Sequence, residues 1–169
     1  TAYEMLRSLV GSEMCIRDST MSTTGRVAGV LRQGGYAVVD VIGLGAGVVD
    51  RLREMGLPVV AFNAAEGTPA LDSSGELGFV NKRSAAWWNM RELLDPTSGA
   101  DLELPPDDLL IGDLTAPKWR VMSGGRIQVE SKDEIRKRLG RSTDHADAVV
   151  QAFWDGEQNG PPSLVDNPW

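Results

Sequence analysis

The chain has 169 residues, of which 41 % are hydrophobic and 24 % charged, proportions typical of one soluble globular domain. Its formal net charge of −7 excludes a broadly basic nucleic-acid binder, although a local basic patch on an acidic enzyme remains compatible with it. The single cysteine, Cys15, cannot form an internal disulfide, and no apolar run approaches the roughly 18 residues that span a bilayer. We therefore expect a soluble, intracellular protein with no membrane partner.

The first nineteen residues differ from the rest of the chain. Thr1–Ser19 has neither a helical nor a strand period, and the run Ser8–Ser19 looks like translated sequencing adapter. We interpret residues 1–19 as a non-native, disordered leader. The alternative is a natural N-terminus that is poorly ordered.

Regular patterns begin at Thr20. A buried, β-branched strand, a helix with one apolar face and a second buried strand follow one another, which predicts a parallel βαβ unit and hence an α/β fold. The segments of this part are the end of a helix at 26–33, a strand at 36–42, a helix at 46–55 and a strand at 58–62.

The remainder of the chain predicts a loop, then helices interrupted by a hairpin at Ser123-Gly-Gly125. The predicted segments are a loop at 63–78, a helix at 82–94, a strand at 102–104, a helix at 105–114, hairpin strands at 119–122 and 126–130, and helices at 132–139 and 144–154. We expect one domain over residues 20–155 and a flexible, Pro- and Gly-rich tail over 156–169.

Asp40 stands near the carboxyl end of a strand that is otherwise apolar. Burying a carboxylate costs several kcal/mol unless it is paired or binds a metal, and ligands of open α/β sheets bind beyond the carboxyl ends of the strands. Asp40 is therefore a candidate metal ligand. The alternative is that it caps the turn ahead of Gly43.

The glycine cluster Gly43-Leu-Gly-Ala-Gly47 lies between this strand and the following helix. It imitates a dinucleotide-binding loop but lacks the full G-x-G-x-x-G spacing, and no acid stands at the end of the next strand. We favour the interpretation that the glycines let the helix begin close to the sheet and leave room for a ligand beside Asp40.

A second acidic cluster begins the last predicted helix. Asp144 and Asp147 are three residues apart and therefore share a helix face. They are either metal ligands or an N-cap with its capping-box partner. The chain's only histidine, His145, lies between them and is a possible auxiliary catalytic group, although a partly exposed polar filler is the commoner role.

Positive charge precedes the Asp144 cluster, and in an acidic protein that placement suggests contacts with phosphate. The alternative is a solvated helix face with the i,i+4 pairs Asp133/Lys137 and Glu134/Arg138. The candidate DNA-binding residues are Lys132, Arg136, Arg138 and Arg141.

Four stretches in this order resemble the nuclease domain of phage terminase large subunits. The stretches are Val38–Leu52, Phe79–Trp87, Gln128–Asp133 and Gly140–Ala148. The last is similar to the family's Ser-Pro-Asp-x-Ala-Asp-Ala motif, with Thr143 in place of the usual proline. Each stretch is weakly specific by itself, whereas the four together cover the chain from about Thr24 to Trp154.

The resemblance implies an RNase H-like (ribonuclease H/resolvase-type) fold, a mixed sheet flanked by helices, in an endonuclease that cuts concatemeric viral DNA. It implies a two-metal site for Mg²⁺ or Mn²⁺, with Asp40 as the ligand on the second strand. The ligand on the last helix is assigned to Asp147 first and Asp144 second. The implied partners are double-stranded viral DNA, a terminase ATPase domain, the small terminase subunit and the portal, in the cytoplasm of an infected bacterium.

The chain departs from the family pattern at its start. The family's first acid lies on an earlier strand, and the residues between Thr20 and Gly35 are too few to supply that part of the sheet. We therefore expect a fold that lacks its first strands, an incomplete metal site and a polypeptide with little or no activity. No Gly-x-x-x-x-Gly-Lys-Ser/Thr run is present for an ATPase motor.

Three other functions fit the patterns less well. One is another RNase H-like nuclease, such as a junction resolvase. Another is a nucleotide-binding α/β module built around Gly43–Gly47. The third is a non-catalytic assembly domain that docks on the portal or on a small subunit.

Overall fold

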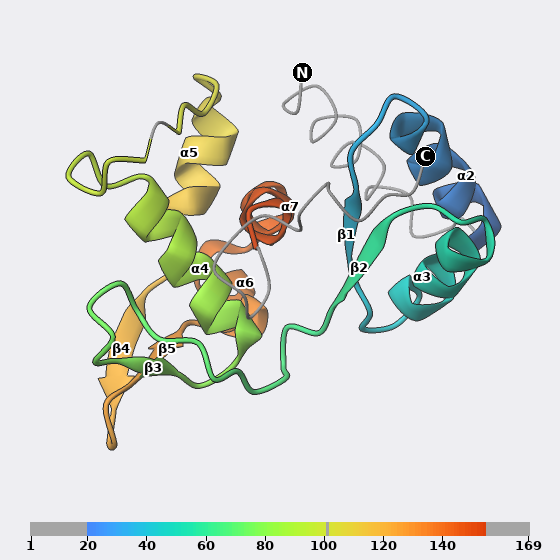
Figure 1. The fold of residues 1–169 in the computed structure, drawn as a ribbon. Coiled ribbons are helices and arrows are strands. Elements are labelled where there is room, and N and C mark those ends of the chain that lie inside the picture. The colour runs from blue at the N-terminus through green and yellow to red at the C-terminus, as the bar shows by residue number, and fades with distance from the viewer. Residues whose placement is uncertain (1–19, 101, 155–169) are drawn as a thin grey trace.

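The structure is a computed structural model, and it describes residues 20–100 and 102–154. The predictions for the leader 1–19 and the tail 156–169 concern residues outside that part. Two small sheets and the helices around them make a mixed α/β fold (Figure 1). Within the described ranges, no helix combines the length and the apolar character needed to cross a bilayer.

The first sheet belongs to the predicted βαβ unit, which is confirmed. Strands β1 (Ala37–Asp40) and β2 (Val59–Phe62) run parallel, with Asp40 opposite Phe62, and helix α3 (Gly45–Glu54) connects them. Helix α2 (Thr20–Leu31) precedes β1 and packs against α3. It begins six residues before the predicted segment, and the Thr24 hydroxyl donates to the carbonyl oxygen of Thr20 at 2.7 Å in this extra turn.

The second sheet contains the predicted hairpin, which is also confirmed. Strands β4 (Trp119–Met122) and β5 (Arg126–Val129) are antiparallel, and the short strand β3 (Gly78–Phe79) pairs parallel with the other edge of β5. The predicted mixed sheet is thus found in part: β3–β5–β4 combines parallel and antiparallel pairs, but β1–β2 forms a sheet of its own among the described residues. Because no β-ladder joins β1–β2 to β3–β5–β4, the two sheets are separate.

The remaining helices are α4 (Lys82–Leu93), α5 (Asp108–Leu114), α6 (Lys132–Leu139) and α7 (Asp144–Ala152). The predicted strand at 102–104 is wrong, since this segment is irregular, although Leu102 and Leu104 pack against the core and explain its apolar pattern. Helix α5 begins three residues later than predicted because the Asp107 side chain accepts hydrogen bonds from two N–H groups of its first turn.

The side chains of β1 alternate between the two faces of the strand, and this alternation determines which way Asp40 points. Ala37 and Val39 belong to a small core with α2 and α3, whereas Val38 packs against a larger core built around α4 and α7. Side chains two apart on a strand point to the same face, so Asp40 lies on the side of Val38 and α7. Phe62 lies next to Asp40 in the sheet and packs edge-on against Trp154, with 6.2 Å between the ring centroids. This contact links β2 to the larger core.

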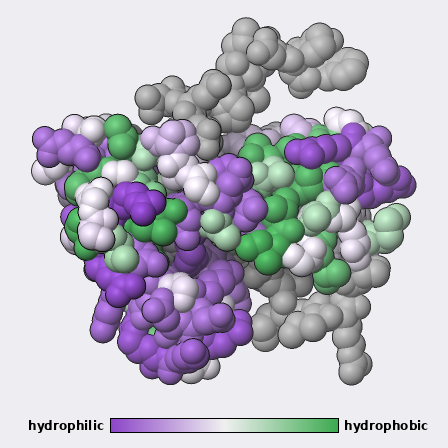
Figure 2. All heavy atoms as spheres, turned by 90° about the horizontal axis from the view of Figure 1, so that it is seen from below, coloured by the Kyte–Doolittle hydropathy of each residue, from purple (hydrophilic) through white to green (hydrophobic). Residues whose placement is uncertain are grey.

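The two halves present different surfaces. Ile42, Leu44 and Met55, in the β1–α3 half, are exposed hydrophobic residues. Figure 2 shows a hydrophobic area on that side of the molecule, beside a largely hydrophilic area over the other half. The turn that follows Asp40 is therefore apolar on its outer side, and Ile42 is 60 % exposed.

A buried acid anchors the segment that leads into α7. Asp113 of α5 is fully buried, and one of its carboxylate oxygens pairs with the Arg141 guanidinium. Its other oxygen has no hydrogen-bond partner among the described residues and lies 3.8 Å from Nδ1 of His145. A buried carboxylate needs such a partner, so this pair fixes the approach of the chain to α7.

Gly45 lets α3 begin against β1. A Cβ at this position would overlap the carbonyl oxygen of Asp40, a backbone atom that can move only with the strand end. The cluster Gly43–Gly47 therefore contains a glycine that packing requires, as the favoured interpretation of the sequence proposed. Gly43 also has a positive φ of 77°.

We predict that Gly45→Ala lowers the free energy of unfolding by about 1–3 kcal/mol or more, the usual cost of overpacking. Gly29→Ala is the matched control, because Gly29 lies inside α2 with no atom within 4 Å of the new methyl group. It should be neutral or stabilise by about 0.5–1 kcal/mol. Urea unfolding of both variants measures the difference, and equal stabilities would contradict the packing role of Gly45.

We predict that Arg141→Met destabilises the protein by about 1–3 kcal/mol, because it leaves the buried Asp113 carboxylate without its cation. Arg51→Met removes a pair whose side chains are 45 % and 63 % exposed. It should change the stability by less than about 0.5 kcal/mol. Thermal denaturation compares the two variants, and similar small effects would show that the Asp113–Arg141 pair contributes little.

Candidate functional site

A pocket of about 460 Å³ lies where the carboxyl ends of β1 and β2 meet α4, α6 and α7. Asp40 and Asp147, from opposite ends of the described chain, both line it. The first turns of all three helices contribute to the wall, and they carry acidic as well as basic side chains into the pocket. The lining residues are Asp40, Ile42, Phe62, Ala64, Ala65, Asn81, Arg83, Ala86, Trp87, Ser131, Lys132, Asp133, Asp147, Val150 and Gln151.

Asp40 caps the turn after β1 and also lines the pocket. Its Oδ1 accepts a hydrogen bond from the backbone N–H of Ile42 at 2.9 Å, so the side chain does cap the turn after β1. The same side chain is only partly buried and faces the pocket. A turn contact to one oxygen restrains the carboxylate and leaves it oriented toward the space between β1 and α7.

Asp147 is a buried carboxylate with 3 % of its surface exposed. Its Oδ1 pairs with the Arg83 guanidinium and accepts a hydrogen bond from Trp87 Nε1 at 3.1 Å. Its Oδ2 accepts from the Thr143 hydroxyl at 3.1 Å and lies 3.3 Å from Lys132 Nζ. These donors compensate for the desolvation of the charge and hold both oxygens in place.

Asp144 lies beside Asp147 but does not line the pocket. Its side chain is 44 % exposed, and its Oδ1 accepts from the Ser142 hydroxyl at 2.6 Å. Lys132 Nζ lies 3.5 Å from this oxygen, so one ammonium bridges both acids of α7. The alternative interpretation as an N-cap with its capping-box partner is wrong, because Thr143 occupies the N-cap position and Asp147 accepts its hydroxyl.

His145 points away from the pocket. Its side chain does not line the pocket wall, and its Nδ1 lies 3.8 Å from the Asp113 carboxylate of α5. The structure thus brings Asp40, Asp147 and Lys132 together and separates His145 from them.

The basic candidates divide into two kinds. Arg138 donates to the Glu130 carboxylate at 2.6 and 3.1 Å and to the carbonyl oxygen of Ala116 at 2.7 Å. The hydrogen bond from Arg138 holds the pKa of Glu130 below its usual value. Arg141 is held by Asp113. The guanidinium groups of Arg138 and Arg141 therefore serve internal contacts, whereas Lys132 lines the pocket and Arg136 is exposed on α6.

The predicted i,i+4 pair Glu134/Arg138 is not formed, because Glu134 takes part in a capping box with Ser131. The Ser131 hydroxyl accepts from the backbone N–H of Glu134 at 3.3 Å, while the Glu134 carboxylate accepts from the backbone N–H of Ser131 at 2.8 Å. Because the box occupies Glu134, Arg138 turns to Glu130 instead. The capping box fixes the first turn of α6, which carries Lys132.

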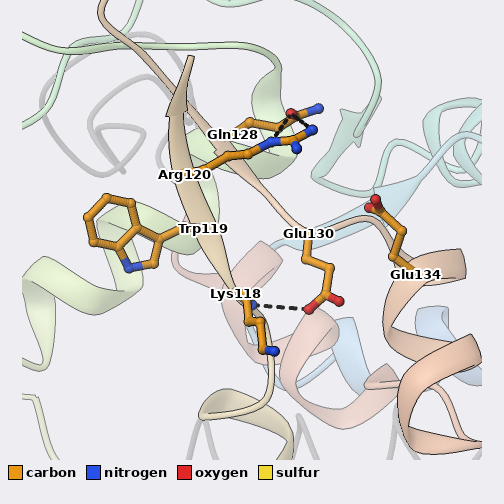
Figure 3. Close-up of a pocket in the computed structure, with 6 residues that line it drawn as sticks. All are labelled: Lys118, Trp119, Arg120, Gln128, Glu130 and Glu134. Atoms are coloured by element: carbon orange, nitrogen blue, oxygen red, sulfur yellow. Dashed lines mark hydrogen bonds between the residues drawn. The ribbon is translucent and has the colours of Figure 1, made fainter.

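A smaller cavity of about 140 Å³ lies between the hairpin and α6 (Figure 3). Its polar groups are already engaged with one another. The backbone N–H of Lys118 donates to Glu130 at 3.1 Å, and the Arg120 guanidinium donates to the Gln128 amide oxygen at 2.8 and 3.0 Å. Neither Asp40 nor Asp147 reaches this cavity, so the chemistry concentrates in the larger pocket.

The structure adds contacts to Asp147 that sequence reasoning did not predict. Arg83 and Trp87 come from α4, and Thr143 precedes α7; all three contact the Asp147 carboxylate. The signal for Arg83 is its place in a stretch that resembles the nuclease family. Its partner lies 64 residues away, however, and periodicity does not identify such a contact.

The pocket presents hard oxygen donors. Among residues 20–100 and 102–154, no three His, Cys, Asp or Glu side chains lie close enough together to enclose a metal ion. Asp40 and Asp147 reach the pocket from separate elements and are a partial set of ligands for a hard divalent cation, and Asp133 lines the same pocket.

Comparison with known proteins gives a match of fold. No protein-family model and no curated protein sequence matches the chain. A point variant of the nuclease domain of the large terminase subunit gp2 of bacterial virus Sf6, solved with manganese and beta-thujaplicinol, superposes with a TM-score of 0.62. The sequences are 20 % identical, over 81 % of this chain and 73 % of that chain.

Two further structures of the same Sf6 domain agree. The variant with calcium gives a TM-score of 0.61 at 20 % identity, over 81 % of this chain and 73 % of that chain. The nuclease domain without the substitution gives a TM-score of 0.60 at 21 % sequence identity, over 79 % of this chain and 71 % of that chain. The chain described here thus has the fold of a terminase large-subunit nuclease domain.

Proposed function

We propose that this chain is the endonuclease domain of a viral DNA-packaging terminase large subunit, which cuts concatemeric DNA by metal-dependent hydrolysis. One observation carries the proposal. Asp40 at the end of β1 and Asp147 on α7, the residues that the family resemblance singles out, line the same pocket. A nucleotide-binding role for Gly43–Gly47 has less support, since Gly45 is required for packing against Asp40.

The residues present fit a hard divalent cation. Carboxylate oxygens are the ligands that Mg²⁺ and Mn²⁺ prefer, and Asp40 and Asp147 would supply them, with Asp144 as a further donor next to Lys132. When bound, two such ions stabilise the attacking water and the leaving oxygen of a phosphodiester. The Sf6 domain was itself solved with manganese and with calcium.

The chain's own groups would position DNA. Lys132 lies at the pocket wall and Arg136 is exposed one turn later on α6, so both could contact a phosphate. Arg138 and Arg141 are weaker candidates because internal carboxylates hold them. We infer a DNA contact along α6 that is smaller than the four-residue patch predicted from the sequence.

We further propose that the metal site needs an additional acid to be fully active. Three carboxylates line the pocket, those of Asp40, Asp133 and Asp147, but no three acidic side chains among the described residues lie close enough together to enclose an ion, whereas two-metal chemistry calls for ligands to both ions. The polypeptide alone should therefore cleave DNA slowly or not at all. In the complete enzyme we place this domain beside an ATPase motor, with the small terminase subunit and the portal as partners.

Manganese-dependent plasmid cleavage by the full-length terminase that contains this chain tests the function. We predict that Asp40→Ala and Asp147→Ala each lower the rate by about 100-fold or more, because each removes a ligand worth several kcal/mol to the transition state. Asp108→Ala, at an exposed acid in the first turn of α5, is the control and should cleave normally. Undiminished cleavage by both site variants would refute the proposal.

A further inference from the structure

The Arg83 guanidinium makes several contacts at the pocket. It pairs with Asp147 Oδ1, and its Nε and Nη2 atoms both lie 3.4 Å from the carbonyl oxygen of Glu130. The centre of the guanidinium lies 5.4 Å from the centroid of the Trp87 ring. Only 11 % of the Arg83 side chain is exposed, so solvent screens these contacts weakly.

Arg83 and Trp87 act on the same oxygen of Asp147. Both donate to Oδ1, whereas Oδ2 receives the Thr143 hydroxyl and the more distant ammonium of Lys132. The Lys132 side chain is 41 % exposed, so the cation next to Oδ2 is much closer to solvent than the one next to Oδ1. The two oxygens are therefore not equivalent: Oδ1 is held by two donors of α4, the largely enclosed Arg83 and the buried Trp87.

The contacts use features that arginine has and lysine lacks. A planar fork of donors can bridge an acid and a carbonyl oxygen while its face stacks on an aromatic ring. A lysine ammonium retains the charge but not this geometry. The position of Arg83 is itself fixed, since its backbone N–H donates to the carbonyl oxygen of Ala64, just beyond β2.

We propose that Arg83 is a positioning residue of the metal site: by holding Oδ1 of Asp147, it presents Oδ2 to the divalent cation. The inference rests on the proposed function, because it gives Asp147 the role of a metal ligand. It assigns Arg83 no contact with the ion or with DNA.

If the Arg83 guanidinium is removed, its charge and its geometry predict opposite changes in the affinity of the site for a divalent cation. Removing a positive charge beside the pocket would strengthen the attraction of a divalent cation. Removing the support of Oδ1 would let the carboxylate turn and weaken the site, as losses of groups that orient ligands do, by about 10- to 100-fold. A positioning role therefore predicts weaker binding of the cation, whereas a purely electrostatic role predicts stronger binding.

The experiment measures Mn²⁺ affinity of this chain by electron paramagnetic resonance, well below the melting temperature of each variant. We expect Arg83→Met to weaken Mn²⁺ binding by about 10-fold or more. Arg83→Lys should also weaken it, although the charge is kept. Arg91→Met is the matched control, because Arg91 lies on the same helix and stacks on Trp88 at 4.4 Å without touching Asp147; its affinity should stay within about twofold of the parent, since it orients no ligand.

A second measurement needs no metal. Hydrogen exchange of the Trp87 indole N–H reports whether Asp147 Oδ1 stays in place, and we expect faster exchange in Arg83→Lys and Arg83→Met but not in Arg91→Met. Affinity that is unchanged in both Arg83 variants, or stronger in Arg83→Met, overturns the proposal, as does unchanged indole exchange. An Mn²⁺ affinity that is insensitive to Asp40→Asn contradicts the proposed function instead.

Discussion

The site depends on a buried carboxylate, that of Asp147, whose two oxygens are held by neighbouring donors. Asp147 is almost fully enclosed, and a lone carboxylate there would cost several kcal/mol. The Arg83 guanidinium and the Trp87 indole compensate for that cost from α4, and the Thr143 hydroxyl does so from the start of α7. Because these groups come from separate elements, the same contacts that stabilise the charge also lock α7 against α4 at the wall of the pocket.

The opposite wall follows from strand geometry. Val38 and Asp40 point to one side of β1 because strand side chains alternate, and that side faces the larger core and α7. Gly45 lets α3 turn back against the strand end, and the Ile42 N–H restrains the Asp40 carboxylate. An acid of a parallel strand and an acid of the last helix thus meet at one pocket, although more than one hundred residues separate them in the chain.

Local patterns predicted most elements because they depend on neighbours in sequence: the parallel βαβ unit, the hairpin at Ser123-Gly-Gly125 and the helix that ends at Gly140. They also singled out Asp40 and the pair Asp144 and Asp147 as candidates, whereas the preference for Asp147 came from the family resemblance. Long-range pairing was not predictable in this way. The partner of Arg141 is Asp113, 28 residues earlier, and the apolar segment 102–104 packs on the core without forming a ladder. Periodicity indicates that a side chain is buried or basic, but not which charge it meets.

The central claim is that one cation approaches both Asp40 and Asp147. Paramagnetic broadening of amide resonances by substoichiometric Mn²⁺ tests it most directly, because broadening decreases steeply with distance from the ion. The account predicts that the amides of residues 40–42 and 146–148 broaden together and that Asp40→Asn abolishes the effect at both segments. Broadening at only one of the two segments, or first at the acidic residues 107–108, would contradict it.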